Sequence, residues 1–148
     1  MLKVAILMGS ESDRPTMEKA EKILSEFDLG FETAVISAHR NPERLTSFVL
    51  DAPGRGVRVF ICGAGLAAAL PGAVAAHTDL PVIGVPLDAS LGGIDSLLSI
   101  AQMPPGVPVA CVGVNNARNA AYLAISILAL EDEGVAAAWH RFREEQRA

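Results

Sequence analysis

The stretch VISAHRNPER, residues 35–44, sets the imidazole of His39 beside the guanidinium of Arg40. An imidazole can donate and accept a proton near neutral pH, and a guanidinium can clamp a phosphate through paired hydrogen bonds. Both residues follow an apolar run that ends at Ser37, and both precede Asn41-Pro42, a pair typical of a helix start. We predict that this segment belongs to a ligand site. The alternative is that both side chains are solvated surface residues.

A second group of small polar residues, Gly9-Ser10-Glu11-Ser12-Asp13, follows the apolar run at residues 4–8. A glycine allows a ligand to approach the backbone, and the hydroxyls of Ser10 and Ser12 at a helix start suit a phosphate or a sugar hydroxyl. Asp13 would repel a phosphate but would accept hydrogen bonds from ribose hydroxyls. Two uses of Asp13 stay open: a helix cap alone, or a cap that also binds ligand.

A third group, Gly63-Ala64-Gly65, follows the apolar run at residues 57–62. We expect it to line the same site, although closing a tight turn is the commoner use of glycine.

Apolar strand-like runs alternate with helical patterns along the chain, which is typical of an α/β protein with a parallel sheet. Ligands of such sheets bind beyond the carboxyl ends of the strands, where the strand order reverses, so the three groups are expected to meet there. We predict strands at residues 4–8, 31–37, 57–62, 81–85 and 107–113, and helices at about 14–27, from 42, within 66–77, at 94–103, at 119–130 and at 135–148.

Length and composition indicate one domain over residues 1–148, with 51% hydrophobic residues and a net charge of -5. The helix at 119–130 is apolar on nearly every side, so we expect burial against other subunits in a homo-oligomer. The negative charge argues against nucleic acid as a partner. No run is long enough to span a membrane and no signal peptide is expected, so we predict a cytoplasmic protein.

The remaining metal-binding residue types are interpreted as structural. Cys62 and Cys111 lie in apolar runs and are expected to be free core residues. His77 and His140 have no partner at metal-ligand spacing, so no metal is predicted. Two other functions of parallel α/β domains fit this sequence poorly. A phosphorylation receiver needs an acidic cluster after its strands, and a flavin-binding module needs aromatic residues near the site.

Taken together, the blocks MGSESD, SAHRNPERL, GAGLAAALPG, LPVIGVP, GIDSLLSIAQMPPGVPVA and NNARNAA make the chain resemble the N5-carboxyaminoimidazole ribonucleotide mutases of purine synthesis, over roughly residues 3–130. The resemblance implies a three-layer flavodoxin-like fold, a homo-octamer and no cofactor. It implies that Ser10, Asp13 and Arg40 hold the ribose and phosphate and that His39 is the general acid/base. It also implies that Gly63-Ala64-Gly65 lines the site of the migrating carboxylate.

The implied reaction moves a carboxylate from the exocyclic amine of the substrate to ring carbon four, through free carbon dioxide. His39 would supply a proton as the carbamate breaks and would later remove the ring hydrogen. The apolar segment 66–70 is expected to keep water away from the carbon dioxide.

One position departs from the family pattern. The family reads Ala-His-Leu-Pro-Gly where this chain reads Ala68-Ala69-Leu70-Pro71-Gly72, so Ala69 replaces a second imidazole. Three alternatives therefore stay open: direct carboxylation of 5-aminoimidazole ribonucleotide, a paralogue acting on another ribonucleotide, and a non-catalytic ribonucleotide-binding protein. The last would need Ser10, Asp13 and Arg40 but not His39.

Overall fold

Side chains of the first strand, β1 (Leu2–Met8), alternate between two apolar cores. Val4, Ile6 and Met8 belong to one core, while Ala5 and Leu7 belong to the other. Successive residues of a strand point to opposite faces, so a strand buried on both faces reads as a continuous apolar run. This is the pattern that predicted a parallel sheet covered on both sides.

The computed structural model describes residues 1–148 and contains one five-stranded sheet in which every pairing is parallel. The other strands are β2 (Gly30–Val35), β3 (Val59–Gly65), β4 (Val82–Leu87) and β5 (Ala110–Cys111). The strand order is β2-β1-β3-β4-β5, so the direction of strand addition reverses between β1 and β3. The α/β, three-layer flavodoxin-like fold expected from the sequence is confirmed.

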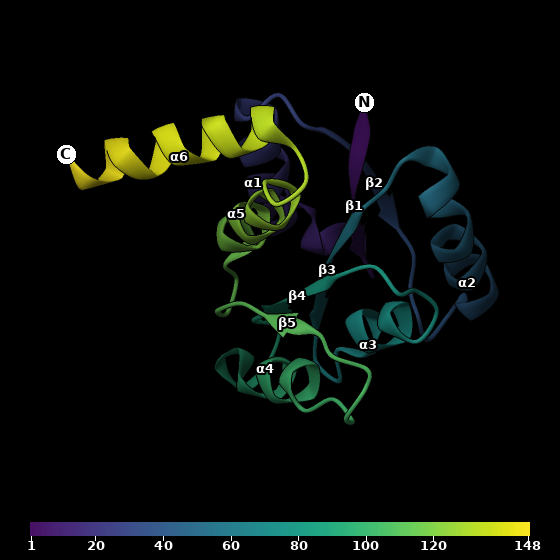
Figure 1. Cartoon of the computed structure of the whole chain (residues 1–148). Helices are drawn as coiled ribbons and strands as arrows, with labels where there is room; N and C mark the ends of the chain where they lie inside the picture. Colours follow the sequence, from purple (N-terminus) through teal and green to yellow (C-terminus); the bar gives the residue numbers. More distant parts are fainter.

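Helices cover both faces of the sheet (Figure 1). They are α1 (Arg14–Glu26), α2 (Pro42–Asp51), α3 (Ala69–Ala75), α4 (Ile94–Ala101), α5 (Ala117–Leu128) and α6 (Glu133–Arg147). Two of them, α1 and α5, contribute to the core that contains Val4, and three, α2, α3 and α4, contribute to the core that contains Ala5. Asparagine and aspartate side chains cap three of the helices, as local sequence predicts.

Four of the five predicted strands end elsewhere in the structure. The strand predicted at 31–37 ends at Val35, and the strand predicted at 81–85 continues to Leu87. β3 continues through Gly63-Ala64-Gly65, which the sequence pattern predicted as a loop, because β4 pairs with it as far as Gly65. β5 is limited to Ala110–Cys111, because this edge strand pairs only with β4, at two positions. β3 lies between β1 and β4 and pairs with both, whereas β5 has only β4 beside it.

The C-terminal helix α6 is anchored by aromatic side chains. Trp139 and Phe142 pack against Phe27 of the α1 end and Tyr122 of α5, and the helix then extends beyond the rest of the chain (Figure 1). The apolar face predicted for this helix is confirmed. α5 itself contacts β3, β4, α1 and α6, so its apolar surface is largely covered within the chain and does not by itself require another subunit.

The two cysteines are free thiols. Cys62 is buried in the core and burial raises the pKa of its thiol; the pKa of the half-buried Cys111 is raised for the same reason. No helix combines the length and the apolar character that crossing a membrane would take.

Candidate functional site

A pocket of about 290 Å³ lies at the carboxyl ends of the strands, where the strand order reverses. All three groups of residues singled out in the sequence reach it, and only Gly63 of the predicted site residues does not. The lining residues come from the segments after β1 and β2, the end of β3, the start of α3 and the segment after β4. They are Gly9, Ser10, Ser12, Asp13, Ser37, Ala38, His39, Arg40, Ala64, Gly65, Leu66, Ala68, Ala69, Leu70 and Ala89.

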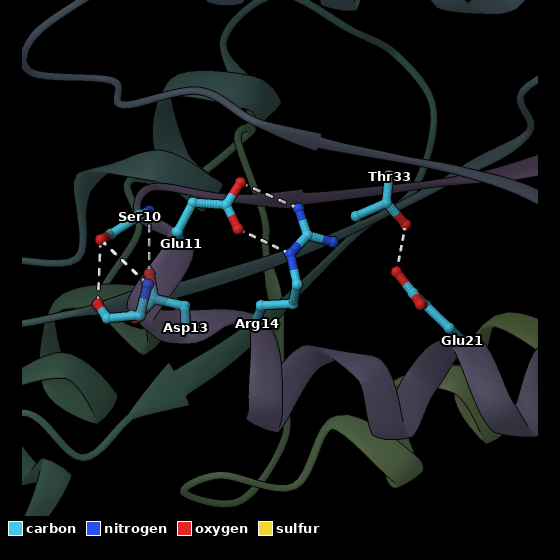
Figure 2. A network of polar contacts seen from close by, with 7 residues as sticks. Ser10, Glu11, Asp13, Arg14, Glu21 and Thr33 are labelled. Atoms are coloured by element: carbon cyan, nitrogen blue, oxygen red, sulfur yellow. Dashed lines mark hydrogen bonds and ion pairs between the residues drawn. The ribbon is translucent and has the colours of Figure 1, made fainter.

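Hydrogen bonds within one short turn shape the wall after β1 (Figure 2). The Ser10 hydroxyl oxygen accepts from the backbone N–H of Ser12 at 3.3 Å, and the two hydroxyls are 3.0 Å apart. The backbone N–H of Ser10 donates to Oδ2 of Asp13 at 3.2 Å. This reciprocal pair is a capping box around the 3₁₀ turn that precedes α1.

The expectation that the Asp13 side chain caps α1 is therefore wrong. Asp13 has helical backbone angles and makes no side-chain capping bond to α1. Its carboxylate turns back toward the residue where the turn begins, because the 3₁₀ turn runs directly into α1. The carboxylate stays on the pocket wall and keeps lone pairs free for hydroxyl donors of a ligand.

Burial raises the pKa of the Asp13 carboxyl, and the hydrogen bond from Ser10 partly opposes this effect. The pKa of Glu11, in the same turn, shifts in the opposite direction. Its hydrogen bond from Arg14, which forms an ion pair at 2.8 Å, lowers the pKa of Glu11 (Figure 2). Arg14 is thus occupied by Glu11 and does not neutralise Asp13.

Gly9 opens space at this wall. A Cβ built on Gly9 would have no atom within 4 Å, and Gly9 is not among the residues with positive φ. Neither packing nor backbone strain requires a glycine here. The absence of a side chain leaves room beside the pocket.

The wall after β2 is the segment 36–41. Its buried Ile36 donates its backbone N–H to the carbonyl of Met8 at 2.9 Å, which extends the pairing of β1 and β2. The Ser37 hydroxyl accepts from the backbone N–H of Arg40 at 3.2 Å, and the Ser37 carbonyl accepts from Asn41 at 2.9 Å. Ser37 therefore shapes the turn, and its hydroxyl proton remains available to a ligand.

His39 and Arg40 are both exposed on this turn, and their side chains form no hydrogen bond or ion pair within the chain. Four other arginines, by contrast, pair with carboxylates. An unpaired imidazole and an unpaired guanidinium at the same pocket can bind an anion and move a proton next to it.

The wall formed by β3 and α3 is apolar. Ala64 and Gly65 line the pocket, whereas a Cβ on Gly63 would lie 2.4 Å from Sδ of the buried Met17. Gly63, also predicted to line the site, lies outside the pocket. Its position in β3 turns it toward α1, because alternate residues of a strand face opposite sides.

Ala89, on the segment after β4, was not found by sequence reasoning. A Cβ on Gly65 would lie 3.0 Å from Cβ of Ala89, so this glycine lets the end of β3 and the segment after β4 approach closely. The one feature of the sequence that could have indicated Ala89 as a pocket residue is its position just past a predicted strand.

Ala69 lines the pocket at the start of α3, and His39 is the single imidazole there. His77 lies elsewhere, with Nε2 3.4 Å from the Thr46 hydroxyl, beside a larger hollow of about 870 Å³ near the start of β4. That hollow contains none of the predicted site residues. No group of three or more His, Cys, Asp and Glu side chains could hold a metal ion.

The strand order and the position of the pocket define a flavodoxin-like α/β protein with a pocket at the point where the strand order reverses, the usual place for a ligand in such folds. Residues 3–148 match the AIR carboxylase family, and the chain belongs to that family. The resemblance found in the sequence is therefore confirmed.

Three similar proteins illustrate the membership. N5-carboxyaminoimidazole ribonucleotide mutase of Pyrococcus abyssi is 51% identical over 99% of this chain and 85% of its own length. Phosphoribosylaminoimidazole carboxylase of Ogataea methanolica is 53% identical over 92% of this chain, which spans only 25% of that longer protein. The crystal structure of Treponema denticola PurE superposes with a TM-score of 0.86 at 30% identity, covering 99% of this chain and 92% of the other.

Proposed function

We propose that this chain is a mutase that converts N5-carboxyaminoimidazole ribonucleotide to 4-carboxy-5-aminoimidazole ribonucleotide in purine biosynthesis. The observation that carries the proposal is the pocket in which unpaired His39 and Arg40 stand beside the Ser10–Asp13 turn. Near-full-length relatives named as this mutase, about 50% identical, give independent support.

Each wall of the pocket has a role in binding the ribonucleotide. Arg40 pairs with the phosphate, assisted by the hydroxyls of Ser12 and Ser37, because a guanidinium and hydroxyls supply several donors to an anion. Asp13 accepts hydrogen bonds from the ribose hydroxyls, and Ser10 holds Asp13 in place while its own hydroxyl faces the sugar. Ala64 and Gly65 leave room for the migrating carboxylate, with Gly63 behind them in the packing against α1.

His39 performs the proton transfers. Its imidazolium gives a proton to the carbamate nitrogen, the N–C bond breaks, and its electron pair stays on nitrogen as carbon dioxide leaves. Ring carbon four then attacks the carbon dioxide and forms the new C–C bond. His39 removes the hydrogen from that carbon and recovers the proton, so the cycle neither consumes nor releases one.

The reaction needs carbon dioxide and ring to stay together between the two steps. Leu66, Ala68, Ala69 and Leu70 form the wall that offers no hydrogen bonds to water from their side chains. We assign to this wall the role of excluding water from the carbon dioxide. The chemistry described uses only side chains of this chain and no cofactor.

Direct carboxylation of 5-aminoimidazole ribonucleotide is the second candidate. Two observations favour it: Ala69 leaves a single imidazole in the pocket, and the carboxylases of Ogataea methanolica and Candida albicans are 53% and 55% identical over most of this chain. A non-catalytic ribonucleotide-binding protein would use the same walls but would have no need of His39.

A labelling experiment separates these candidates. Purified protein is given unlabelled N5-carboxyaminoimidazole ribonucleotide in ¹³C-bicarbonate buffer, and, separately, 5-aminoimidazole ribonucleotide in the same buffer, with His39→Asn as the matched control. A mutase yields mainly unlabelled product from the first substrate. A direct carboxylase yields labelled product from 5-aminoimidazole ribonucleotide, at a rate comparable to that of a mutase on its own substrate. A binding protein yields no product from either substrate.

We further propose that the chain acts as a single domain, in the cytoplasm, as a homo-octamer. The oligomer is supported by large apolar side chains left exposed to solvent: Leu66 at the pocket, and Leu91, Ile94 and Leu98 on and before α4. Light scattering at micromolar concentration is expected to give a mass near eight times 15.5 kDa. A species of 15.5 kDa alone would contradict the oligomer.

A further inference from the structure

We propose that Arg44, which does not line the pocket, is a positioning residue that holds the segment 36–41 and thereby places His39 and Arg40. The inference rests on the proposed function for its catalytic consequence, but its structural basis is independent.

The carbonyl of Val35 has no partner in the sheet. β2 is an edge strand, and the backbone N–H of Ile36 points inward to the Met8 carbonyl at 2.9 Å. Across a trans peptide, the C=O of one residue and the N–H of the next point in opposite directions. The Val35 oxygen therefore points to the open edge of the sheet, where no strand can donate to it.

Arg44 supplies the missing donor. Its Nη1 donates to the Val35 oxygen at 3.3 Å, reaching back from the first turn of α2 to the end of β2. Its backbone N–H donates to Oδ1 of Asn41, also at 3.3 Å. One residue thus contacts the last residue of β2 and the last residue of the segment, and so closes the ends of the segment 36–41.

This closure matters because the two functional side chains have no contacts of their own that fix them. His39 and Arg40 make no side-chain hydrogen bond or ion pair, so their positions depend on the backbone of the segment. Within the segment, the buried Ile36 is bonded to the Met8 carbonyl, and Ser37 is bonded to Arg40 and Asn41. Arg44 adds a contact that joins the segment to the first turn of α2. Arg44 forms no ion pair with a carboxylate, so its guanidinium is not committed elsewhere.

The first test measures backbone protection without any ligand. Arg44→Met keeps most of the aliphatic stem and removes the donors, Arg44→Lys keeps one charged donor, and Arg141→Met changes an exposed arginine on α6. We expect amide hydrogen exchange at residues 36–41 to accelerate about two- to tenfold in the Met variant, which is the effect of losing one hydrogen bond. The acceleration should be smaller in the Lys variant. Exchange there unchanged from the Arg141→Met control would overturn the inference.

The second test is a double-mutant cycle with Arg40→Ala, using 5-aminoimidazole ribonucleotide as the probe in calorimetry. If Arg44 acts through Arg40, Arg44→Met weakens binding several-fold in the wild type but has almost no further effect once Arg40 is absent. Losses that multiply would mean that Arg44 contacts the nucleotide directly, and the inference would be wrong.

The third test measures turnover of the Arg44 variants. Arg44→Met is expected to lower kcat as well as affinity, because His39 moves with the same segment, and Arg44→Lys is expected to restore most of both. If the wild type turned over neither imidazole substrate, the proposed function would fail, yet the exchange experiment would still decide the role of Arg44.

Discussion

The backbone N–H of Ser10 donates a hydrogen bond to Oδ2 of Asp13 at 3.2 Å (Figure 2), and Asp13, whose side chain makes no capping bond to α1, lines the pocket. The same carboxylate is partly withdrawn from water, and this raises its pKa. A group whose pKa is raised by burial contributes most to stability while it is protonated, and that contribution is lost as the pH rises through its pKa in the folded protein. Hydroxyl donors of a bound ribose favour the ionised form instead.

Affinity for the ribonucleotide should therefore depend on pH through Asp13. As the pH falls from about 7 to about 4, wild-type affinity is expected to drop more steeply than that of Asp13→Asn, which has no charge to lose. Calorimetric titration of both proteins across this range isolates the carboxyl, because the phosphate of the ligand titrates equally in each. Parallel profiles would remove Asp13 from the ribose contacts.

His39→Asn is expected to bind the ribonucleotide within a few-fold of wild type and to lose about two to four orders of magnitude in kcat, the usual range for removing a general acid/base. Folding should be unaffected, since the imidazole has no hydrogen-bond partner to lose. Steady-state kinetics measures the loss of turnover, and circular dichroism checks that the variant is folded. Turnover close to wild type would require another route for the proton.

Arg40→Ala is expected to weaken ribonucleotide binding about ten- to a hundredfold, the effect of losing a charge-assisted hydrogen bond to phosphate. The guanidinium has no ion pair within the chain, so the loss should appear in binding and hardly in the free energy of unfolding. Arg141→Ala, on α6, is the control and should bind normally. An unchanged dissociation constant for Arg40→Ala would place the phosphate elsewhere.

Two glycine substitutions should separate packing from binding. Gly63→Ala forces a methyl group to within 2.4 Å of the buried Met17 sulfur and is expected to lower the free energy of unfolding by about 1–3 kcal/mol. Gly9→Ala meets no atom within 4 Å, so it should leave the free energy of unfolding within about 1 kcal/mol while weakening ligand binding. Denaturant unfolding measures the stability of the two variants, and calorimetry measures their ligand binding. Equal losses of stability in Gly63→Ala and Gly9→Ala would contradict the expected difference between them.

Features that depend on a few neighbouring residues were determined by the sequence alone. Asn41 caps α2 with its own side chain, and the apolar residues of β1 alternate between two cores, because capping bonds and side-chain periodicity are local. The position of His39 and Arg40 just past an apolar strand likewise predicted their place at the ligand edge of the sheet.

Contacts between distant segments were decided only by the tertiary structure. The pairing of β3 with β4 made a strand of Gly63-Ala64-Gly65 and turned Gly63 toward Met17 of α1. The approach of Ala89 to Gly65, and the hydrogen bond from Arg44 to the Val35 carbonyl at an open edge, depend on which strands become neighbours. Strand neighbours are chosen by the packing of the whole chain, so no local pattern around these residues could predict them.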